Sequence, residues 1–541
     1  MRKRGAQATI SAAIGAVVAA LIAGSAPAGA GPPRLLGLRI SNGGTPFAGD
    51  TPLLATVSPN GDGFRDRALI RFKLDRSASV EVRVVATDEV RRPVKTIWTT
   101  RRRLAAGPHT IGWRPARTTP DRTYLVRFLV EGRTGGRRVY GFEPPRRGRF
   151  TSGLVVRVQG IDAGFLARSY PVGGDATVAI STDARRIRLQ LFSFATLPRP
   201  TVRDLRTGGV AVAPAVRLDL QHRGSAPRFV QISHAGVPES GLYFLRVTSG
   251  DRRVGYAPLI LRPRKLGEHR VAVVLSTNTW QAYNFLDANG DGWGDSWYVS
   301  GATRVVDLRR PFLDFGVPFR FRDWDLSFIS WLRRTGKQVD YISDDDLQRI
   351  RTGDTLRRNY DLVVFPGHEE YVSDHVYDIV TRYRDLGGRL MFLSANNFFW
   401  KVRREGSLIR RVQMWRALGR PEAALVGTQW VASNYGSVQG LYTVQGAGST
   451  PWAFAGTGLR NGSTFGRYGI EIDARAPSSP PGTRLLARSP GLIGTHDAEM
   501  TYYETGAGAR VFAAGVVNFA ASINDPAVSR LVENLWDRLT R

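Results

Sequence analysis

The chain has 541 residues, a formal net charge of +30 and no cysteine. The lack of cysteine excludes disulfides, cysteine nucleophiles and thiolate metal sites. Only six of the 76 basic residues are lysines, and the arginines are spread along the whole chain. We interpret this excess of arginine as a trace of genome composition. We expect no nucleic-acid partner, while loose association with an anionic cell envelope remains open.

Residues 1–30 contain, in order, the three regions of a secretory signal peptide: a basic start, an apolar segment and a small-residue cleavage site. Basic residues at positions 2–4 precede the short apolar segment Ile10–Ala23, and Ala28–Ala30 supplies small residues for cleavage. An uncleaved anchor helix is the alternative, but the apolar segment is short for a bilayer span. We therefore predict cleavage after Ala30 and a soluble, exported protein.

Residues 33–150 are typical of an all-β unit. Ala68–Leu74 and Val80–Val85 alternate apolar and polar residues, the pattern of strands with one solvated face. The preceding segment, S-P-N-G-D-G-F-R-D at Ser58–Asp66, resembles the opening of immunoglobulin-like modules in flagellar hook-capping and bacterial surface proteins. We expect an immunoglobulin-like β-sandwich here.

The same segment offers oxygen ligands for Ca²⁺. Asn60, Asp62 and Asp66 have a suitable spacing. The alternative is a glycine-rich turn closed by hydrogen bonds from these side chains to the backbone.

A second β-sandwich-like unit is predicted at residues 153–264. Its clearest strands are Ala176–Ile180, Arg188–Phe192 and Gly241–Val247, separated by turn residues. Neither β unit contains a catalytic constellation.

From residue 266 to 541, buried strands alternate with helices, which predicts an α/β domain with a doubly wound parallel sheet. The helix after Ser373 has a cap, one apolar face and a Gly387-Gly388 stop. The other predicted elements are a helix at Asp325–Arg334 and strands at Val271–Ser276, Val339–Ser343, Leu362–Phe365, Leu390–Ser394 and Val511–Phe519.

Leu362–Tyr371, reading L-V-V-F-P-G-H-E-E-Y, places polar residues directly after a buried strand. Residues past the carboxyl ends of parallel strands line the ligand crevice of such sheets. If the backbone stays extended, His368 and Glu370 face one spot, where they could hold a metal or transfer protons. An exposed polar loop is the alternative.

A second candidate calcium loop is D-A-N-G-D-G-W-G-D. Asp287, Asn289, Asp291 and Asp295 have the one-three-five-nine spacing of a calcium loop, with glycine at position six. Tyr298 stands where an EF-hand has its twelfth-position carboxylate. An Asp/Gly-rich turn is again the alternative.

Five segments of the C-terminal region together resemble one enzyme family. They are T-N-T-W-Q-A-Y-N (277–284), R-P-F (310–312), Y-I-S-D-D-D-L (341–347), G-H-E-E-Y (367–371) and S-A-N-N-F-F-W (394–400). The region is similar to the C-terminal domain of the N,N-dimethylformamidase large (beta) subunit. The resemblance implies a relative of class I glutamine amidotransferases and of flavodoxin-like folds, without the cysteine nucleophile.

The resemblance also implies a single Fe³⁺ held by two tyrosine phenolates and one glutamate. Glu370 matches the carboxylate ligand, His368 a nearby histidine and Asn396 a nearby asparagine. Such an iron would polarise an amide carbonyl and acidify water. His368 would then relay a proton to the leaving amine, and Asn396 would donate a hydrogen bond to the oxyanion.

The tyrosine ligands follow less directly from the motifs. Tyr283, in W-Q-A-Y-N, matches one phenolate. Tyr243 is the first candidate for the second phenolate, with Tyr298 as the alternative and Tyr256 as a further choice. Each of these residues could instead be a core tyrosine with a hydrogen-bonded hydroxyl.

We therefore predict an exported, metal-dependent hydrolase of C–N bonds in small amides. A non-catalytic surface protein that binds carbohydrate or cell wall is the alternative, favoured by the β units and the export signal. Glutamine amidotransfer is excluded because cysteine is absent. The formamidase is not exported and works with a small subunit that this chain lacks, so the substrate and any homo-oligomer remain open.

Overall fold

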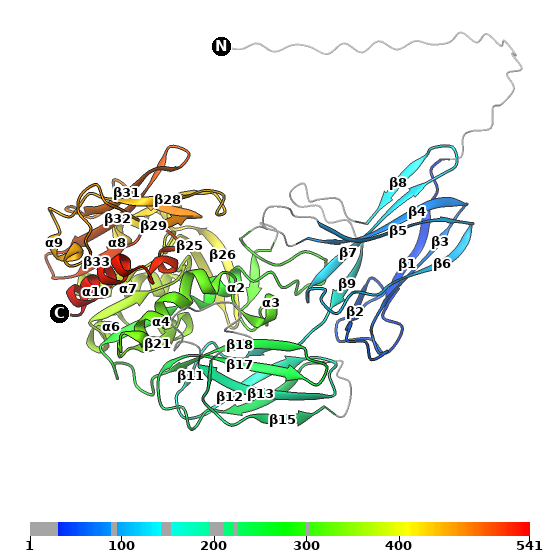
Figure 1. Ribbon diagram of the computed structural model, residues 1–541, viewed down its shortest axis with the longest axis horizontal. Coiled ribbons are helices and arrows are strands. Elements are labelled where there is room, and N and C mark those ends of the chain that lie inside the picture. The colour runs from blue at the N-terminus through cyan, green and yellow to red at the C-terminus, as the bar shows by residue number, and fades with distance from the viewer. Residues whose placement is uncertain (1–30, 88–94, 142–152, 194–208, 221–225, 299–302) are drawn as a thin grey trace, which may run out of the picture.

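The computed structural model describes residues 31–87, 95–141, 153–193, 209–220, 226–298 and 303–541. The protein is multidomain and mostly β, with two β units ahead of a C-terminal domain (Figure 1). The predicted signal segment lies outside the described residues. Within the described ranges, no helix is both long and apolar enough to cross a bilayer.

The first β unit consists of two sheets that share one core. Phe72 and Phe128, from opposite sheets, make an edge-to-face contact with ring centroids 5.6 Å apart. β9 was expected in the second unit, but it pairs with β2 and β7 of the first. One sheet contains β1 (Leu35–Ser41), β3 (Ala68–Leu74) and β6 (Gly107–Trp113); the other contains β2 (Leu54–Val57), β9 (Leu154–Val158), β7 (Thr123–Glu131), β4 (Ala78–Ala86) and β5 (Lys95–Leu104), with β8 (Arg137–Tyr140) on β7.

The second β unit also has two sheets around one core. The three predicted strands are present as β12, β13 and β17, and the two units fit the predicted β-sandwiches; the immunoglobulin-like assignment stays a prediction. The sheets contain β10 (Asp162–Phe165), β12 (Asp175–Ser181) and β16 (Arg228–Ser233), and β11 (Tyr170–Pro171), β18 (Val254–Arg262), β17 (Gly241–Ser249), β13 (Arg186–Ser193), β14 (Val210–Ala211) and β15 (Val216–Asp219).

The C-terminal domain is built on a nine-stranded mixed sheet. Its first five strands are parallel, as the sequence predicts for the strands that alternate with helices. The last four strands are antiparallel, an extension that our prediction missed. The order is β21 (Asp340–Ser343), β19 (Val271–Leu275), β22 (Leu362–Phe365), β24 (Arg389–Phe392), β33 (Arg510–Ala513), β32 (His496–Glu504), β31 (Arg484–Ile493), β28 (Gln439–Val444) and β29 (Thr464–Gly469).

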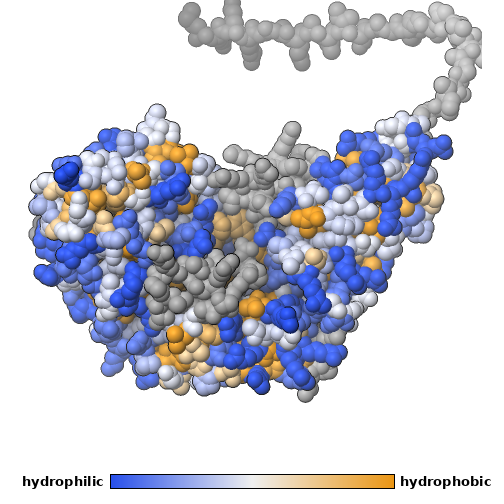
Figure 2. All heavy atoms as spheres, in the orientation of Figure 1, coloured by the Kyte–Doolittle hydropathy of each residue, from blue (hydrophilic) through white to orange (hydrophobic). Residues whose placement is uncertain are grey.

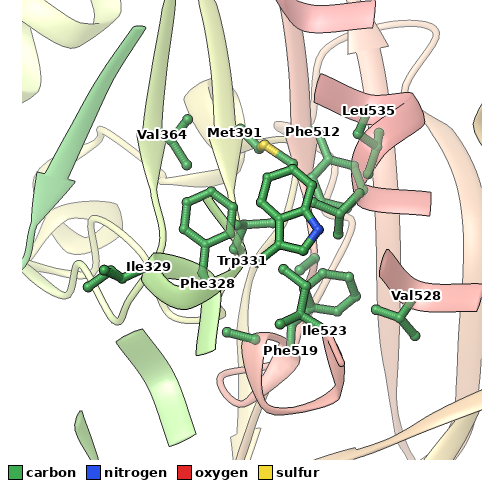
Figure 3. Close-up of a cluster of buried hydrophobic side chains, with 14 of the residues drawn as sticks. Phe328, Ile329, Trp331, Val364, Met391, Phe512, Phe519, Ile523, Val528 and Leu535 are labelled. Atoms are coloured by element: carbon green, nitrogen blue, oxygen red, sulfur yellow. The ribbon is translucent and has the colours of Figure 1, made fainter. Parts of the chain in front are cut away.

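Helices cover both faces of this sheet. On one face Trp331 of α4 (Ser327–Arg334) packs with Phe328 against Met391, Phe512 and residues of α10 (Pro526–Thr540) (Figure 3). The opposite face carries α5 (Asp344–Arg349), α6 (Gly353–Asn359) and α7 (Asp374–Asp385). Successive residues of β22 alternate between these two cores, so the whole strand is buried.

Two details of the helices bear on the site. The predicted cap of α7 is present, with Ser373 Oγ accepting from the Val376 N–H. The predicted helix at Asp325–Arg334 begins earlier, with a π-helical segment at Arg322–Leu326. Such segments occur frequently at functional sites.

The remaining described elements of the C-terminal domain are short helices, small sheets and 3₁₀ turns. They are α2 (Thr277–Ala282), α3 (Leu313–Gly316), α8 (Ala423–Val426), α9 (Pro451–Phe454), the four-stranded sheet of β20 (Val305–Asp307), β26 (Leu408–Met414), β25 (Trp400–Glu405) and β23 (Tyr371–Val372), the pair of β27 (Gln429–Ser433) and β30 (Glu471–Ala474), and 3₁₀ turns at Trp415–Leu418 and Phe519–Ser522.

The loop Asp287–Asp295 joins the C-terminal domain to the first β unit. Trp293 packs against a small apolar cluster of that unit, which contains Leu54 and Leu125. A Cβ added at Gly292 would lie 2.3 Å from the Leu125 side chain, so only glycine fits this close contact. On the visible face of the molecule, hydrophilic side chains are interspersed with smaller hydrophobic patches (Figure 2).

Candidate active site

Four of the predicted site residues lie at the carboxyl ends of three adjacent parallel strands. Tyr283 ends α2, which follows β19; His368 and Glu370 follow β22; Asn396 follows β24. β22 lies between β19 and β24 and is parallel to both. Their loops therefore open at one edge of the sheet, where such folds bind ligands.

Three of the predicted residues are in direct contact. The Tyr283 hydroxyl donates a short hydrogen bond to Glu370 Oε2 and lies 3.1 Å from His368 Nε2. His368 Nε2 is 3.2 Å from Glu370 Oε2. All three side chains are buried, so the exposed-loop alternative for His368 and Glu370 is wrong.

Burial and charge both act on this cluster. Burial raises the pKa of Tyr283 well above its usual value, and the nearby carboxylates Glu370 and Glu471 raise it further. Burial alone would lower the pKa of His368, but its hydrogen bond to Glu370 and the charges of Glu471 and Asp473 raise it overall. The imidazole is thus held in a strongly negative environment, which favours its protonated form.

Asn396 contacts two acids that our sequence analysis missed. Its Nδ2 donates to Glu471 Oε2 at 2.8 Å, and its backbone N–H donates to Asp473 Oδ1 at 2.8 Å. Burial raises the pKa of Glu471 to about 7 and that of Asp473 to about 7. Both acids lie on β30, in the segment G-I-E-I-D. Two acids spaced two residues apart in an otherwise apolar strand are the sequence pattern that could have indicated them.

The structure places Tyr298, rather than Tyr243, at the cluster. The rings of Tyr283 and Tyr298 have centroids 4.8 Å apart, and Ser296 Oγ donates to the Tyr283 carbonyl at 3.1 Å. The Tyr298 hydroxyl is buried and has no hydrogen-bond partner among the residues that the structure describes. Burial raises the pKa of the Tyr298 hydroxyl, and the nearby carboxylate of Glu471 raises it further.

Tyr243 lies instead in the core of the second β unit, where its hydroxyl donates to the Glu239 carbonyl at 3.0 Å. Burial raises its pKa to about 12. A polar cavity of about 360 Å³ opens nearby, between Glu239 and Arg333, but none of the predicted site residues lines it. The geometry therefore favours Tyr298, our alternative, as the second phenol. Tyr256, the further choice, packs in the core that covers α4.

Further acids are buried behind the site. Glu369, between His368 and Glu370 in the sequence, lies beside Asp344. Burial raises the pKa of Asp344 to about 6, and burial together with Asp344 raises that of Glu369 well above its usual value. Asp325, in the π-helical segment, packs against Gly367, and burial raises its pKa to about 7.

Backbone strain is concentrated around these loops. Non-glycine residues with positive φ are uncommon and tend to mark functional sites. Asn396 has φ 54°, Phe398 58° and Ile470, which precedes Glu471, 72°. Arg320 and Tyr435 also have φ 54°. The chain holds these segments in conformations that its residues do not favour.

The donors of the site fit a hard cation. Tyr283, Tyr298 and Glu370 bring two phenols and a carboxylate together. Within the described ranges, the buried Tyr298 hydroxyl and His368 Nδ1 have no hydrogen-bond partner. Phenolate and carboxylate oxygens suit oxidised iron better than a soft metal. Among the residues that the structure describes, no group of three histidines, aspartates or glutamates is arranged as a metal site, so the tyrosines are essential to this fit.

The two candidate calcium loops are closed by hydrogen bonds from backbone N–H groups to aspartate side chains. Asp66 accepts from the N–H groups of Gly61 and Gly63, each at 2.8 Å. Asp287 accepts from Gly290 at 2.7 Å and from Gly292 at 2.8 Å. These bonds are those of the turn alternative. Calcium binding by either loop stays a prediction.

Comparison with known proteins identifies relatives for the C-terminal half. The sequence model of the family described as "N,N-dimethylformamidase beta subunit-like, C-terminal" matches residues 230–531. The N,N-dimethylformamidase beta subunit of Paracoccus aminophilus is 25% identical over 334 residues, which cover 48% of this chain and 43% of that protein. The beta subunit from Alcaligenes sp is 25% identical over 282 residues, 40% of this chain and 36% of that protein.

The matched region therefore spans less than half the length of these curated relatives. Among solved structures, elastase-activated α2-macroglobulin of Escherichia coli aligns with 10% identity and a TM-score of 0.16, over 43% of this chain and 20% of that chain. A score this low carries no argument about the fold.

Proposed function

Because the chain belongs to the N,N-dimethylformamidase beta subunit-like C-terminal family, we propose that it is an exported, iron-dependent hydrolase of amide C–N bonds. One observation carries the proposal: Tyr283, His368 and Glu370 converge on a single buried point. A scaffold that only binds carbohydrate has no need of such a costly group of buried polar side chains.

Glu370, Tyr283 and Tyr298 would hold the iron. When bound, ferric iron would polarise the amide carbonyl and lower the pKa of a water molecule. The two phenols must lose their protons to bind a cation, and their raised pKa values show how strongly the site without metal opposes this. The free energy of metal binding would have to exceed this cost.

The proton transfers fall to Glu471 and His368. Glu471, with a pKa of about 7, is poised near neutrality to take a proton from the attacking water. Asn396 orients this carboxylate through its 2.8 Å hydrogen bond. Its second amide N–H, which donates to no other described residue, would donate to the carbonyl oxygen of the substrate. His368, held protonated by its acidic neighbours, would deliver a proton to the departing amine from Nε2.

Three wider features belong to the same proposal. The parallel strand order β21-β19-β22-β24-β33 supports a doubly wound, flavodoxin-like domain. Export would follow from the predicted signal at residues 1–30. The relatives are subunits of a larger enzyme, so assembly with a second polypeptide or with further copies of this chain accords with the proposal.

The test is amine release from a panel of small formamides and acetamides. Wild type should carry iron, absorb visible light through phenolate-to-iron charge transfer and hydrolyse some of the panel. His368→Ala should keep the iron and its colour but lose about a hundred- to ten-thousand-fold in rate. The exposed His496 gives the matched control, His496→Ala, which should behave as wild type.

Two results would contradict the proposal. Loss of iron in His368→Ala would make this residue a ligand rather than a proton donor. Failure of the iron-loaded wild type on every amide would favour the surface-binding alternative.

A further inference from the structure

Arg320 is a cation at the edge of the site, and the residues that the structure describes give it no acidic partner. It is half-buried, and its guanidinium carbon lies 5.7 Å from the ring centroid of Phe319. Within the described residues, no ion pair or side-chain hydrogen bond joins it to another group. By contrast, Arg322, two residues later, is exposed and pairs with Asp323 at 3.4 Å.

One aromatic layer separates Arg320 from the reacting residues. The Phe319 ring centroid is 5.1 Å from that of Tyr298 and 6.4 Å from that of Tyr283. Charges on both sides of this layer act on the Tyr298 hydroxyl. Glu471 and Glu370 raise its pKa, and Arg320 lowers it. Arg320 therefore lies at the rim, and the acids lie in the interior.

The backbone holds this rim in place. Arg320 and Tyr435 share the left-handed conformation, and the half-exposed Tyr435 ring lies 5.6 Å from Tyr298. A Cβ added at Gly436 would lie 3.8 Å from Arg320 Nη2, so the loop that carries Tyr435 packs beside the guanidinium. Strained backbone of this kind persists only where the surrounding structure holds the residue in place, and it is concentrated at functional sites.

The other arginine near the site differs in this respect. The guanidinium of Arg411 lies between two indoles, 5.4 Å from Trp297 and 4.9 Å from Trp400, where cation–π contacts stabilise it. Among the described residues Arg320 has one ring beside it, that of Phe319, and its side chain is partly exposed. A planar guanidinium with free N–H groups is matched best by a carboxylate, which it binds through two parallel hydrogen bonds.

We propose that Arg320 binds a carboxylate of the substrate, so that the preferred substrates are N-formyl or N-acyl amino acids rather than neutral amides. The inference rests on the proposed amide hydrolysis. The acids of the interior would repel a carboxylate, whereas the neutral amide can pass them. The substrate therefore enters amide first, with its carboxylate retained at the rim.

The experiment compares anionic and neutral substrates of matched length. N-formylglycine, N-formyl-β-alanine and N-formyl-4-aminobutanoate are assayed beside neutral N-alkylformamides. Wild type should favour at least one anion, and Arg320→Gln should lower kcat/KM for that anion roughly 10- to 100-fold, as expected for a lost charge-assisted pair, while the neutral series is unchanged. Arg322→Gln removes the same charge from the same segment and should have no effect.

The other outcomes distinguish failure of this inference from failure of the proposed function. Equal use of anions and neutral amides by wild type overturns the inference but leaves the hydrolase intact. Loss of the preference in Arg411→Gln, with Arg320→Gln unaffected, also overturns it. If no amide is hydrolysed, the proposed function fails, and calorimetric titration with N-formyl amino acids decides the inference separately. Weaker binding by Arg320→Gln than by wild type supports the inference. Equal binding by the two proteins, or no binding by wild type, overturns it.

Discussion

Buried acids of the second β unit and buried acids around the candidate active site differ in their partners. In the second β unit, the fully buried Asp183 pairs with Arg253 Nη1 at 2.7 Å. The same arginine pairs with Asp251, and together with Ser249 it lowers the pKa of that acid to about 2 despite burial. In the C-terminal domain, burial raises the pKa of Asp325, Glu471 and Asp473 to about 7.

The difference lies in the cations. In the part of the chain that the structure describes, neither lysine nor arginine forms an ion pair with these three acids or with Asp344, Glu369 or Glu370. A paired buried acid fixes one element against another. Acids that are buried together without a cation destabilise the fold, and such groups are retained where they bind a metal or move protons. The comparison separates the scaffold of this protein from its chemistry.

Replacing Glu370 tests the chemical side of the comparison most directly. Glu370→Gln keeps the shape of the side chain but removes the charge that a cation needs. We expect loss of bound iron and of visible absorption, with an unchanged far-UV circular dichroism spectrum. Glu405→Gln, at the exposed last residue of β25, is the matched control. Full iron occupancy of Glu370→Gln, measured by mass spectrometry, would remove Glu370 from the ligand set.

The role of Glu471 predicts the next largest effect. Glu471→Gln should lower kcat by about a hundred- to ten-thousand-fold, because an amide cannot accept the proton of water. In wild type, activity should rise as the pH passes about 7, since only ionised Glu471 acts as a base. This limb of the pH profile should be absent from the mutant.

The same mutant should be more stable than wild type when both lack iron. A neutral amide avoids the cost of burying an uncompensated charge, so the melting temperature of Glu471→Gln should increase. A mutant that is both inactive and less stable would assign Glu471 to the scaffold.

In the second β unit the corresponding change should have the opposite sign. Arg253→Gln leaves Asp183 buried without a cation and should lower the free energy of unfolding by about 3 kcal/mol. Arg186→Gln breaks the exposed pair with Asp219 and should cost less than about 0.5 kcal/mol. Chemical denaturation followed by fluorescence measures both. Equal effects would remove the distinction between paired and unpaired acids.

The candidate calcium loops extend the comparison to a smaller effect. Burial raises the pKa of Asp287 to about 6 and raises that of Asp291, whereas Asn60 of the other loop donates to Asp251, which Arg253 already neutralises. We therefore expect chelation to act mainly through the Asp287 loop. Calcium at a hundred times its Kd would stabilise the fold by about 2.7 kcal/mol.

The measurement uses the iron-free Glu370→Gln protein, so that a chelator cannot act through iron. Its melting temperature should fall with chelator, and Asp291→Asn should abolish that response whereas Asp62→Asn should not. A melting curve that does not respond to chelator would assign both loops to plain turns.

The local elements of the C-terminal domain could be predicted because their signals are local. Leu362–Phe365 forms β22 with the predicted bounds, and its apolar residues are buried on both faces. The placement of His368 and Glu370 also followed from local rules, since an extended backbone directs alternate side chains to one side. The antiparallel strands β28, β29, β31 and β32 escaped prediction because their pairing depends on partners far along the chain.

The acids of β30 and the second phenol were missed or misplaced for a related reason. Glu471 reaches the site only because β30 pairs with β27 and bridges to Val516, contacts without a signal in the sequence. Tyr243 and Tyr298 are equally plausible in composition, and the packing of Tyr298 on Tyr283 decides between them. Contacts between distant segments had to be seen in three dimensions.

The contact of Trp293 with the first β unit has a consequence for how such proteins can diversify. The loop that carries Trp293 connects Tyr283 to Tyr298, and its shape depends on a cluster in another unit. The first β unit therefore cannot be exchanged for another domain without a change in this loop. A descendant that lost or exchanged it would have to remodel this loop at once, or lose the alignment of its two phenols. Inheritance of the N-terminal unit and of the active site is coupled through one tryptophan.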